Sequence, residues 1–209
     1  MPDARASKLR IGVLISGSGT NLQSIIDACG RGEIDGEVVV VISDKEAAFG
    51  LQRARNEAIS AVFLDRSHHD SAVAYNAALT ELLRAHGVQL VVMAGYMRLL
   101  GKAVLDAFPG AVLNLHPALL PAFPGASGIR HAFEYGVKVT GVTVHFASEV
   151  FDEGPIIAQA AVLITEDDSL ETLEAKIHAI EHEIYPRAIQ AYASGRLVVD
   201  GRRVRVLPE

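Results

Sequence analysis

The sequence predicts an α/β fold built on a doubly wound, mainly parallel and twisted sheet, with antiparallel strands at its C-terminal edge. Short apolar runs alternate with helically spaced segments up to residue 116, which is typical of βαβ units. A glycine-rich loop directly follows the first apolar run. Beyond residue 139, two apolar runs flank a polar turn, and this pattern indicates antiparallel pairing.

Composition limits the class of protein. The chain has 209 residues, of which 50% are apolar, with a net charge of −6 and one cysteine. We expect one domain over 1–209, with a flexible lead at 1–8, a nucleotide-phosphate half at 9–110 and a catalytic and ligand-binding half at 111–209. The charge argues against nucleic acid or an anionic membrane as a partner, and one cysteine excludes a disulfide framework. The sequence has no apolar run of membrane-spanning length and no secretory segment at its start, so a cytoplasmic location is expected.

The first strand and the loop after it form a candidate phosphate site. Leu9–Ile15 is short, apolar and β-branched, as buried strands are, and Leu22–Gly30 has helical spacing. The loop Ser16–Asn21 between them would present backbone N–H groups and a helix N-terminus to an anion. It lacks the spacing of a dinucleotide fingerprint and the lysine of a P-loop, so a single phosphate fits best. The alternative is a tight turn in which Thr20 or Asn21 caps the helix.

The rest of the first half continues the alternation of strands and helices. Three more strands are expected at Glu37–Ser43, Ala61–Leu64 and Leu90–Ala94. Helices are expected at Phe49–Ala58, at 101–108, and from Asp70 as N-cap through His86, with Gly87 ending this last helix. This order predicts parallel strands joined by right-handed crossovers.

The fifth strand, Ala111–His116, carries the most chemistry. Alternate side chains of a strand share a face, so Asn114 and His116 point one way and Leu115 the other. Pro117 ends the strand, which places the pair at a carboxyl end, where open α/β sheets bind ligands. An amide and an imidazole there can bind a developing oxyanion and handle a proton. The alternative is that both are ordinary polar residues of a strand end.

The antiparallel edge is expected to supply a carboxylate. Thr140–Phe146 alternates strictly, and Ile156–Val162 is a second strand candidate. The polar turn between them contains Asp152. A carboxylate beside His116 would favour the charged imidazole, and Asp152 is the best candidate for it. The alternative is an aspartate that only shapes the turn.

The C-terminal part is expected to contain a long helix and a hairpin. Ser169 and Thr172 open the helix, which runs to about Ser194 and is kinked by Pro186. Leu197–Val206 contains an Asp-Gly turn between two strand-like runs.

Seven segments, taken in order, match those of a known family. They are ISGSGTNL (Ile15–Leu22), FGLQRA (Phe49–Ala54), AGYMRLL (Ala94–Leu100), LNLHPALLPAFPG (Leu113–Gly125), GVTVHF (Gly141–Phe146), DEGPIIAQ (Asp152–Gln159) and EHEIYP (Glu181–Pro186). On these segments the chain resembles the glycinamide ribonucleotide formyltransferases, the folate-dependent family of purine synthesis. The resemblance covers nearly the whole chain and implies a Rossmann-like formyltransferase fold.

The resemblance also implies site residues. The catalytic trio would be Asn114, His116 and Asp152. The ribonucleotide would be bound by Gly17, Ser18, Gly19, Thr20, Asn21 and Glu181. The folate would be bound by Met97, Arg98, Leu99, Leu100, Asn114, Ser148, Glu149, Val150, Phe151 and Asp152.

The implied reaction is direct formyl transfer from 10-formyltetrahydrofolate, a co-substrate, to the amine of 5'-phosphoribosylglycinamide. Asn114 and protonated His116 would stabilise the oxyanion, and Asp152 would raise the pKa of His116. No metal is needed, the partners are small molecules, and the choice between monomer and homodimer stays open.

Several residues depart from the family pattern or stay outside it. Ala72 stands where some relatives have an arginine, and His131 stands where many have glutamine. Arg98 could meet the folate or only a surface acid. His145 is interpreted as structural, and His182 as a neighbour of the nucleotide site. His178 and His182 lie one turn apart but lack a third ligand, so we expect no metal there.

Other functions remain as alternatives. A folate hydrolase that releases formate and a formyltransferase for initiator tRNA share the Asn–His–Asp arrangement, but the position of the first strand, the end at Glu209 and the net charge fit them poorly. A nicotinamide oxidoreductase would need a GxGxxG loop, and Asp44 is a weak ribose-binding candidate. A non-catalytic nucleotide-binding module is the last alternative.

Overall fold

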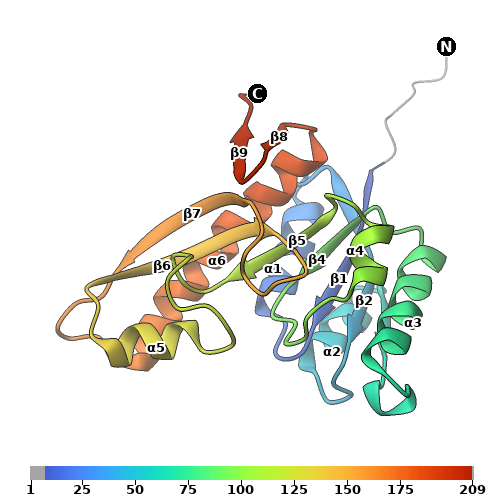
Figure 1. Cartoon of the computed structure of the whole chain (residues 1–209), viewed down its shortest axis with the longest axis horizontal. Coiled ribbons are helices and arrows are strands. Elements are labelled where there is room, and N and C mark those ends of the chain that lie inside the picture. The colour runs from blue at the N-terminus through green and yellow to red at the C-terminus, as the bar shows by residue number, and fades with distance from the viewer. Residues whose placement is uncertain (1–7, 209) are drawn as a thin grey trace.

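The computed structural model describes residues 8–208, whose strands form one nine-stranded sheet in the order β3-β2-β1-β4-β5-β6-β7-β9-β8 (Figure 1). The strands are β1 (Leu9–Ile15), β2 (Gly36–Ser43), β3 (Ser60–Phe63), β4 (Leu90–Met93), β5 (Val112–His116), β6 (Val139–Phe146), β7 (Ile156–Leu163), β8 (Leu197–Asp200) and β9 (Arg203–Val206). The helices are α1 (Thr20–Gly30), α2 (Phe49–Asn56), α3 (Ala72–Ala85), α4 (Lys102–Ala107), α5 (Gly128–Tyr135) and α6 (Leu170–Ala193), with a short 3₁₀ helix η1 (Arg66–His68).

The pairing of the strands confirms the predicted fold class. Strands β1 to β5 pair in parallel, and β6 and β7 continue the sheet in antiparallel orientation beside β5. The hairpin β8–β9 is antiparallel and joins β7 through Ile156 and Arg203. The sheet is therefore mainly parallel over its first half and antiparallel toward its C-terminal edge.

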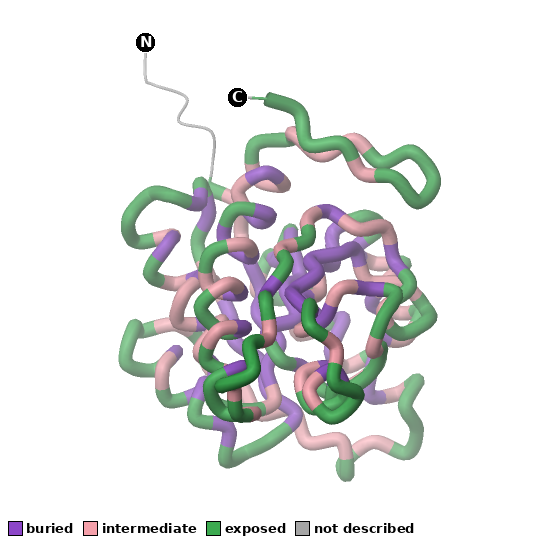
Figure 2. Tube along the Cα trace, turned by 90° about the vertical axis from the view of Figure 1, so that its left-hand side faces the viewer, coloured by how far each residue is buried: buried purple, intermediate pink, exposed green. Residues whose placement is uncertain are grey.

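Each face of the sheet has its own apolar core, because side chains alternate along the strands. In β1, Ile11 and Val13 pack on the face covered by α1 and α6, whereas Leu14 packs on the face covered by α3 and α4. Figure 2 shows buried positions gathered in the interior and exposed ones around the rim, including the hairpin β8–β9. Two covered faces explain why the central strands read as continuous apolar runs.

The order of the strands positions the ligand site. The chain proceeds from β1 outward to β2 and β3 on one side, and then returns to β4 on the other side of β1. Loops at the carboxyl ends of β1 and β4 therefore leave toward opposite faces, and in such sheets ligands bind at this reversal. The glycine loop, which we define as Ser16–Asn21, follows β1, and the loop Gly95–Gly101 follows β4.

Most predicted elements agree with the structure within two residues, and the differences are local. The N-cap of α3 is Ser71, whose Oγ accepts from the N–H of Ala74 at 3.0 Å, so the prediction of Asp70 was wrong. The capping box of Ser169 and Thr172 is confirmed. The expected flexible lead, except for residue 8, lies outside the described residues. Along 8–208, no helix combines the length and apolar character that crossing a bilayer needs.

Candidate active site

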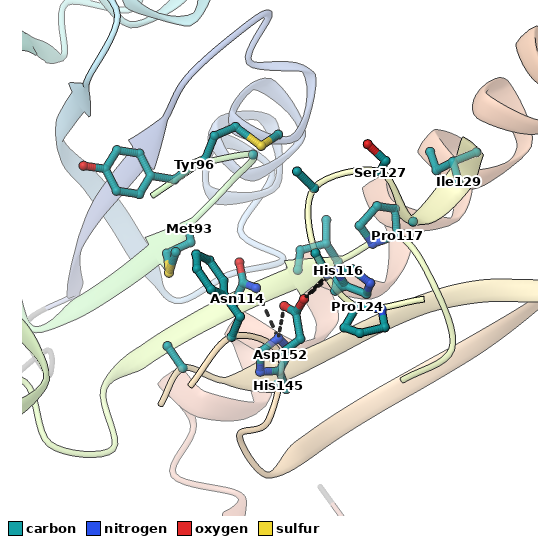
Figure 3. A pocket seen from close by; sticks show the side chains of 18 of the residues that line it. Met93, Tyr96, Asn114, His116, Pro117, Pro124, Ser127, Ile129, His145 and Asp152 are labelled. Carbon is teal, nitrogen blue, oxygen red and sulfur yellow. Dashed lines mark hydrogen bonds and ion pairs between the residues drawn. The ribbon is translucent and has the colours of Figure 1, made fainter. Parts of the chain in front are cut away.

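A pocket of about 900 Å³ opens at the carboxyl ends of β4 and β5. Its walls come from the loop after β4, the segment 124–130, the loop 147–152 and one face of α6. Asn114, His116 and Asp152 all line it, although Asp152 lies far from the other two in the chain (Figure 3). The structure thus brings the predicted trio together.

Strand β5 and the loop after β6 place the imidazole and the carboxylate side by side. The Nδ1 atom of His116 lies 3.4 Å from Oδ2 of Asp152, and these side chains are only 4% and 5% exposed. The other ring nitrogen of His116, Nε2, donates to the carbonyl of Phe123 at 2.8 Å. In the neutral ring Nδ1 is then unprotonated and faces a carboxylate, so a proton bound at Nδ1 would be stabilised by Asp152.

The turn that carries Asp152 is held in an unusual backbone conformation. Asp152 has a φ of 57°, which is uncommon for a residue other than glycine. Its Oδ2 accepts from the N–H of Gly125 at 2.8 Å. A Cβ atom on Gly154 would lie 1.6 Å from the carbonyl oxygen of Phe146, so only glycine allows the chain to pass there. The backbone therefore fixes the carboxylate against His116.

His145 is a site residue that the sequence analysis assigned to structure alone. In the antiparallel pair β5–β6 it stands opposite Asn114, so both side chains share a face. Its Nδ1 donates to the carbonyl of Phe146 at 2.8 Å, which leaves Nε2 as an acceptor for the amide Nδ2 of Asn114 at 3.1 Å. Nε2 also lies 3.7 Å from Oδ1 of Asp152 (Figure 3). The sequence analysis missed the position of His145 because the register between β5 and β6 could not be derived from the sequence.

Burial determines the charge state of the site without substrate. Desolvation lowers the pKa of His116, and it outweighs the nearby charge of Asp152, which acts in the opposite direction. Asp152 therefore acts on the pKa of His116 in the expected direction, but its effect is smaller than that of burial. Burial also acts to raise the pKa of Asp152, but the hydrogen bond from the N–H of Gly125 and the neighbouring histidines act in the opposite direction, and the pKa lies below its ordinary value. The resting pair is an aspartate beside a neutral imidazole.

Two of the candidate ribonucleotide residues, Asn21 and Glu181, are in contact. This carboxylate is 3% exposed and accepts from Nδ2 of Asn21 at 2.9 Å, which connects the glycine loop to α6. Among the loop residues named from the sequence, Asn21 lines the pocket, whereas Gly17 to Thr20 lie outside its lining. The N-cap of α1 is Gly19, with a φ of 72°, so neither Thr20 nor Asn21 caps the helix.

His178 faces the pocket, which the sequence analysis did not predict. His178 lines the pocket and its Nδ1 lies 2.8 Å from Oε2 of Glu181, which raises the pKa of the imidazole. The ring of His182 stacks on that of His178 behind it. Within residues 8–208, no group of three or more histidine, cysteine, aspartate or glutamate residues is arranged to hold a metal ion.

The candidate folate residues divide into two groups. Those that line the pocket are Met97, Leu99, Leu100, Asn114, Ser148, Val150, Phe151 and Asp152. Met97 and Phe151 are 62% and 53% exposed, so apolar side chains stand at the mouth. Arg98 and Glu149 are outside the lining, and Arg98 instead pairs with the buried Asp44.

The two departures from the family pattern also lie outside the pocket lining. Ala72 is in the first turn of α3, and His131 lines a separate hollow beside Phe123 and Tyr135.

Comparisons with known proteins show which family the chain belongs to. The formyl transferase family model matches residues 9–189. Phosphoribosylglycinamide formyltransferases of Bacillus subtilis and Escherichia coli are 41% and 43% identical over 181 and 189 residues. These matches cover 87% and 90% of this chain, and 93% and 89% of the two relatives. A glycinamide ribonucleotide transformylase from Symbiobacterium toebii aligns with a TM-score of 0.95 at 55% identity, over 98% of this chain and 96% of that structure. The chain belongs to the formyl transferase family.

Proposed function

We propose that this formyltransferase moves the formyl group of 10-formyltetrahydrofolate to the amine of 5'-phosphoribosylglycinamide. The observation that carries the proposal is one pocket lined by Asn114, His116 and Asp152 that also reaches Glu181. The names of the bacterial relatives support the same reaction. Apolar side chains at the mouth suit a flat folate ring, and the hydrogen-bonded pair Asn21 and Glu181 supplies polar groups beside the glycine loop.

The proposed chemistry is a direct attack. The neutral amine nitrogen bonds to the formyl carbon, the carbonyl oxygen becomes an oxyanion, and the bond from that carbon to the folate nitrogen then breaks. Asn114 Nδ2 has two hydrogens and uses one toward His145, so the other is free for the oxyanion. The amine loses one proton and the departing folate nitrogen gains one. His116 and Asp152, in contact at 3.4 Å, are placed to hold that proton in transit.

The deciding experiment measures whether folate deformylation depends on the amine. Purified protein is mixed with the formyl folate, with and without the ribonucleotide, and both the deformylated folate and free formate are quantified. Consumption that requires the ribonucleotide, with no formate release, is the expected result. Formate release without the amine would indicate a hydrolase, and ribonucleotide binding without turnover would indicate a binding module.

The role of Asn114 has its own test. Asn114→Ala removes one oxyanion donor, so turnover should fall by roughly 10²–10³-fold while the fold is retained. Asn56→Ala makes the same exchange at an exposed position of α2 and should behave as the wild type. Activity of Asn114→Ala near that of the wild type would remove this amide from the mechanism.

A further inference from the structure

Asp44 is a buried carboxylate at the reversal point of the sheet that the proposed mechanism leaves unused. It directly follows β2, and its side chain is only 2% exposed. A carboxylate this deeply buried must be paired or hydrogen-bonded, because removing it from water is costly. The hydrogen-bond partners of Asp44 therefore show which segments its carboxylate holds in place.

Its partners come from the two loops that flank the pocket. Oδ1 accepts from Oγ of Ser16 at 2.6 Å, at the start of the glycine loop. Oδ2 accepts from Nε of Arg98 at 2.7 Å, in the loop Gly95–Gly101. Ser16 Oγ in turn accepts from the backbone N–H of Met97 at 3.0 Å. One carboxylate thus connects the loop after β1 to the loop after β4.

Other contacts of the loop Gly95–Gly101 do not involve Asp44. At its far end, the N–H of Gly101 donates to Oδ1 of Asn76 at 2.7 Å, which ties it to α3. The guanidinium of Arg98 also lies over the ring of Tyr75, 5.7 Å from its centroid. The Met97 end is held by Asp44 and Ser16, next to the buried Tyr96, whose hydroxyl bonds that of Tyr75 at 2.7 Å. Met97, Leu99 and Leu100 all line the pocket, so this position shapes the pocket wall.

We propose that Asp44 is a positioning residue that holds the glycine loop and the Met97 loop in the single arrangement in which both substrates bind. The inference rests on the proposed function, because it assigns the ribonucleotide to the first loop and the folate to the second. Asp44 does not line the pocket, so it acts through Ser16 and Arg98. A purely structural ion pair would affect stability and leave both Michaelis constants unchanged.

Asp44→Asn tests the proposal by removing the charge at nearly constant volume. Misplacement of binding groups by about 1 Å can cost up to roughly 10²-fold, so we expect both Michaelis constants to rise at least about tenfold, with a smaller loss of kcat. The matched control is Asp106→Asn, since Asp106 pairs with Lys102 at 2.9 Å on the exposed side of α4. The control should keep both constants.

Ser16→Ala keeps the test decisive if Asp44→Asn fails to fold. It removes the acceptor for Met97 but retains the pair of Asp44 and Arg98, so the constant for the formyl folate should rise. Constants within about twofold of the wild type in Ser16→Ala, measured well below its melting temperature, would overturn the proposal. A wild-type protein without amine-dependent transfer would instead refute the proposed function, so the two failures are distinguishable.

Discussion

Tyr185 connects the helix that carries Glu181 to the strands that carry the candidate site. It is fully buried in α6, and its hydroxyl donates to the carbonyl oxygens of Met93 and Leu113, each at 3.0 Å. These residues lie in β4 and β5, and Glu181 lies one helical turn before the tyrosine. Burial raises the pKa of the Tyr185 hydroxyl well above its ordinary value, so it remains a donor across the pH range of any assay.

Tyr185→Phe removes this donor and keeps the ring. One proton is shared by two carbonyls, so the loss is about one net hydrogen bond, roughly 0.5–1.5 kcal/mol, plus part of the cost of a less satisfied buried carbonyl. We expect the free energy of unfolding to fall by about 2 kcal/mol. For a chain of this size, that corresponds to a melting temperature lower by about 4–8 °C.

The measurement is urea and thermal denaturation beside a matched variant. Tyr135→Phe removes the hydroxyl of a tyrosine that is 80% exposed, so the stability of this variant should equal that of the wild type. The slope m should be unchanged in both, because the exposed surface of the unfolded chain is the same. Equal stabilities of the two variants would refute the reasoning, since they would show that the buried hydroxyl contributes nothing beyond an exposed one.

Three further predictions concern the site and its support. Asp152→Ala should fold but lose at least about 10²-fold in turnover, measured by amine-dependent deformylation. Gly154→Ala should lower the free energy of unfolding by about 1–3 kcal/mol, because its Cβ would overlap a carbonyl oxygen, whereas Gly30→Ala, with no atom within 4 Å, should not. The carboxylate of Glu181 raises the pKa of the His178 imidazole in the folded protein. The ion pair of these residues therefore stabilises the fold fully below about pH 6.5, and this contribution is lost as the pH rises through the raised pKa of His178. His178→Gln should therefore be more destabilising at acidic than at basic pH in urea titrations.

Local pattern was sufficient for the sheet and for the first two members of the trio. The strand β5 follows from an apolar run, and the period of two places Asn114 and His116 on one face. Its position at the rim follows from Pro117 and from the strand–helix order. Each of these inferences uses residues close together in the sequence, where the physical rule is short-ranged.

Contacts between elements that are distant in the chain could not be predicted from local sequence patterns. His145 enters the site because β6 pairs with β5 in one particular register, and a shift by one residue would turn it to the other face. Arg98 lies against Asp44 because β1 stands between β2 and β4 and brings their loops together. Neither relation leaves a local signal, since both depend on the order and register of strands far apart in the chain.

His116 shows why identifying its partner Asp152 correctly was not enough to predict the charge of the imidazole. The sequence argument considered one effect, the attraction between an imidazolium and the carboxylate of Asp152, and its direction was right. The structure adds the loop after Pro117, which closes over the ring and leaves the side chain 4% exposed. Desolvation then exceeds the attraction and lowers the pKa of His116. Under the proposed mechanism, we therefore expect protonation at Nδ1 to become favourable when a developing oxyanion adds negative charge to the pocket, so that the imidazole gains its charge during the reaction.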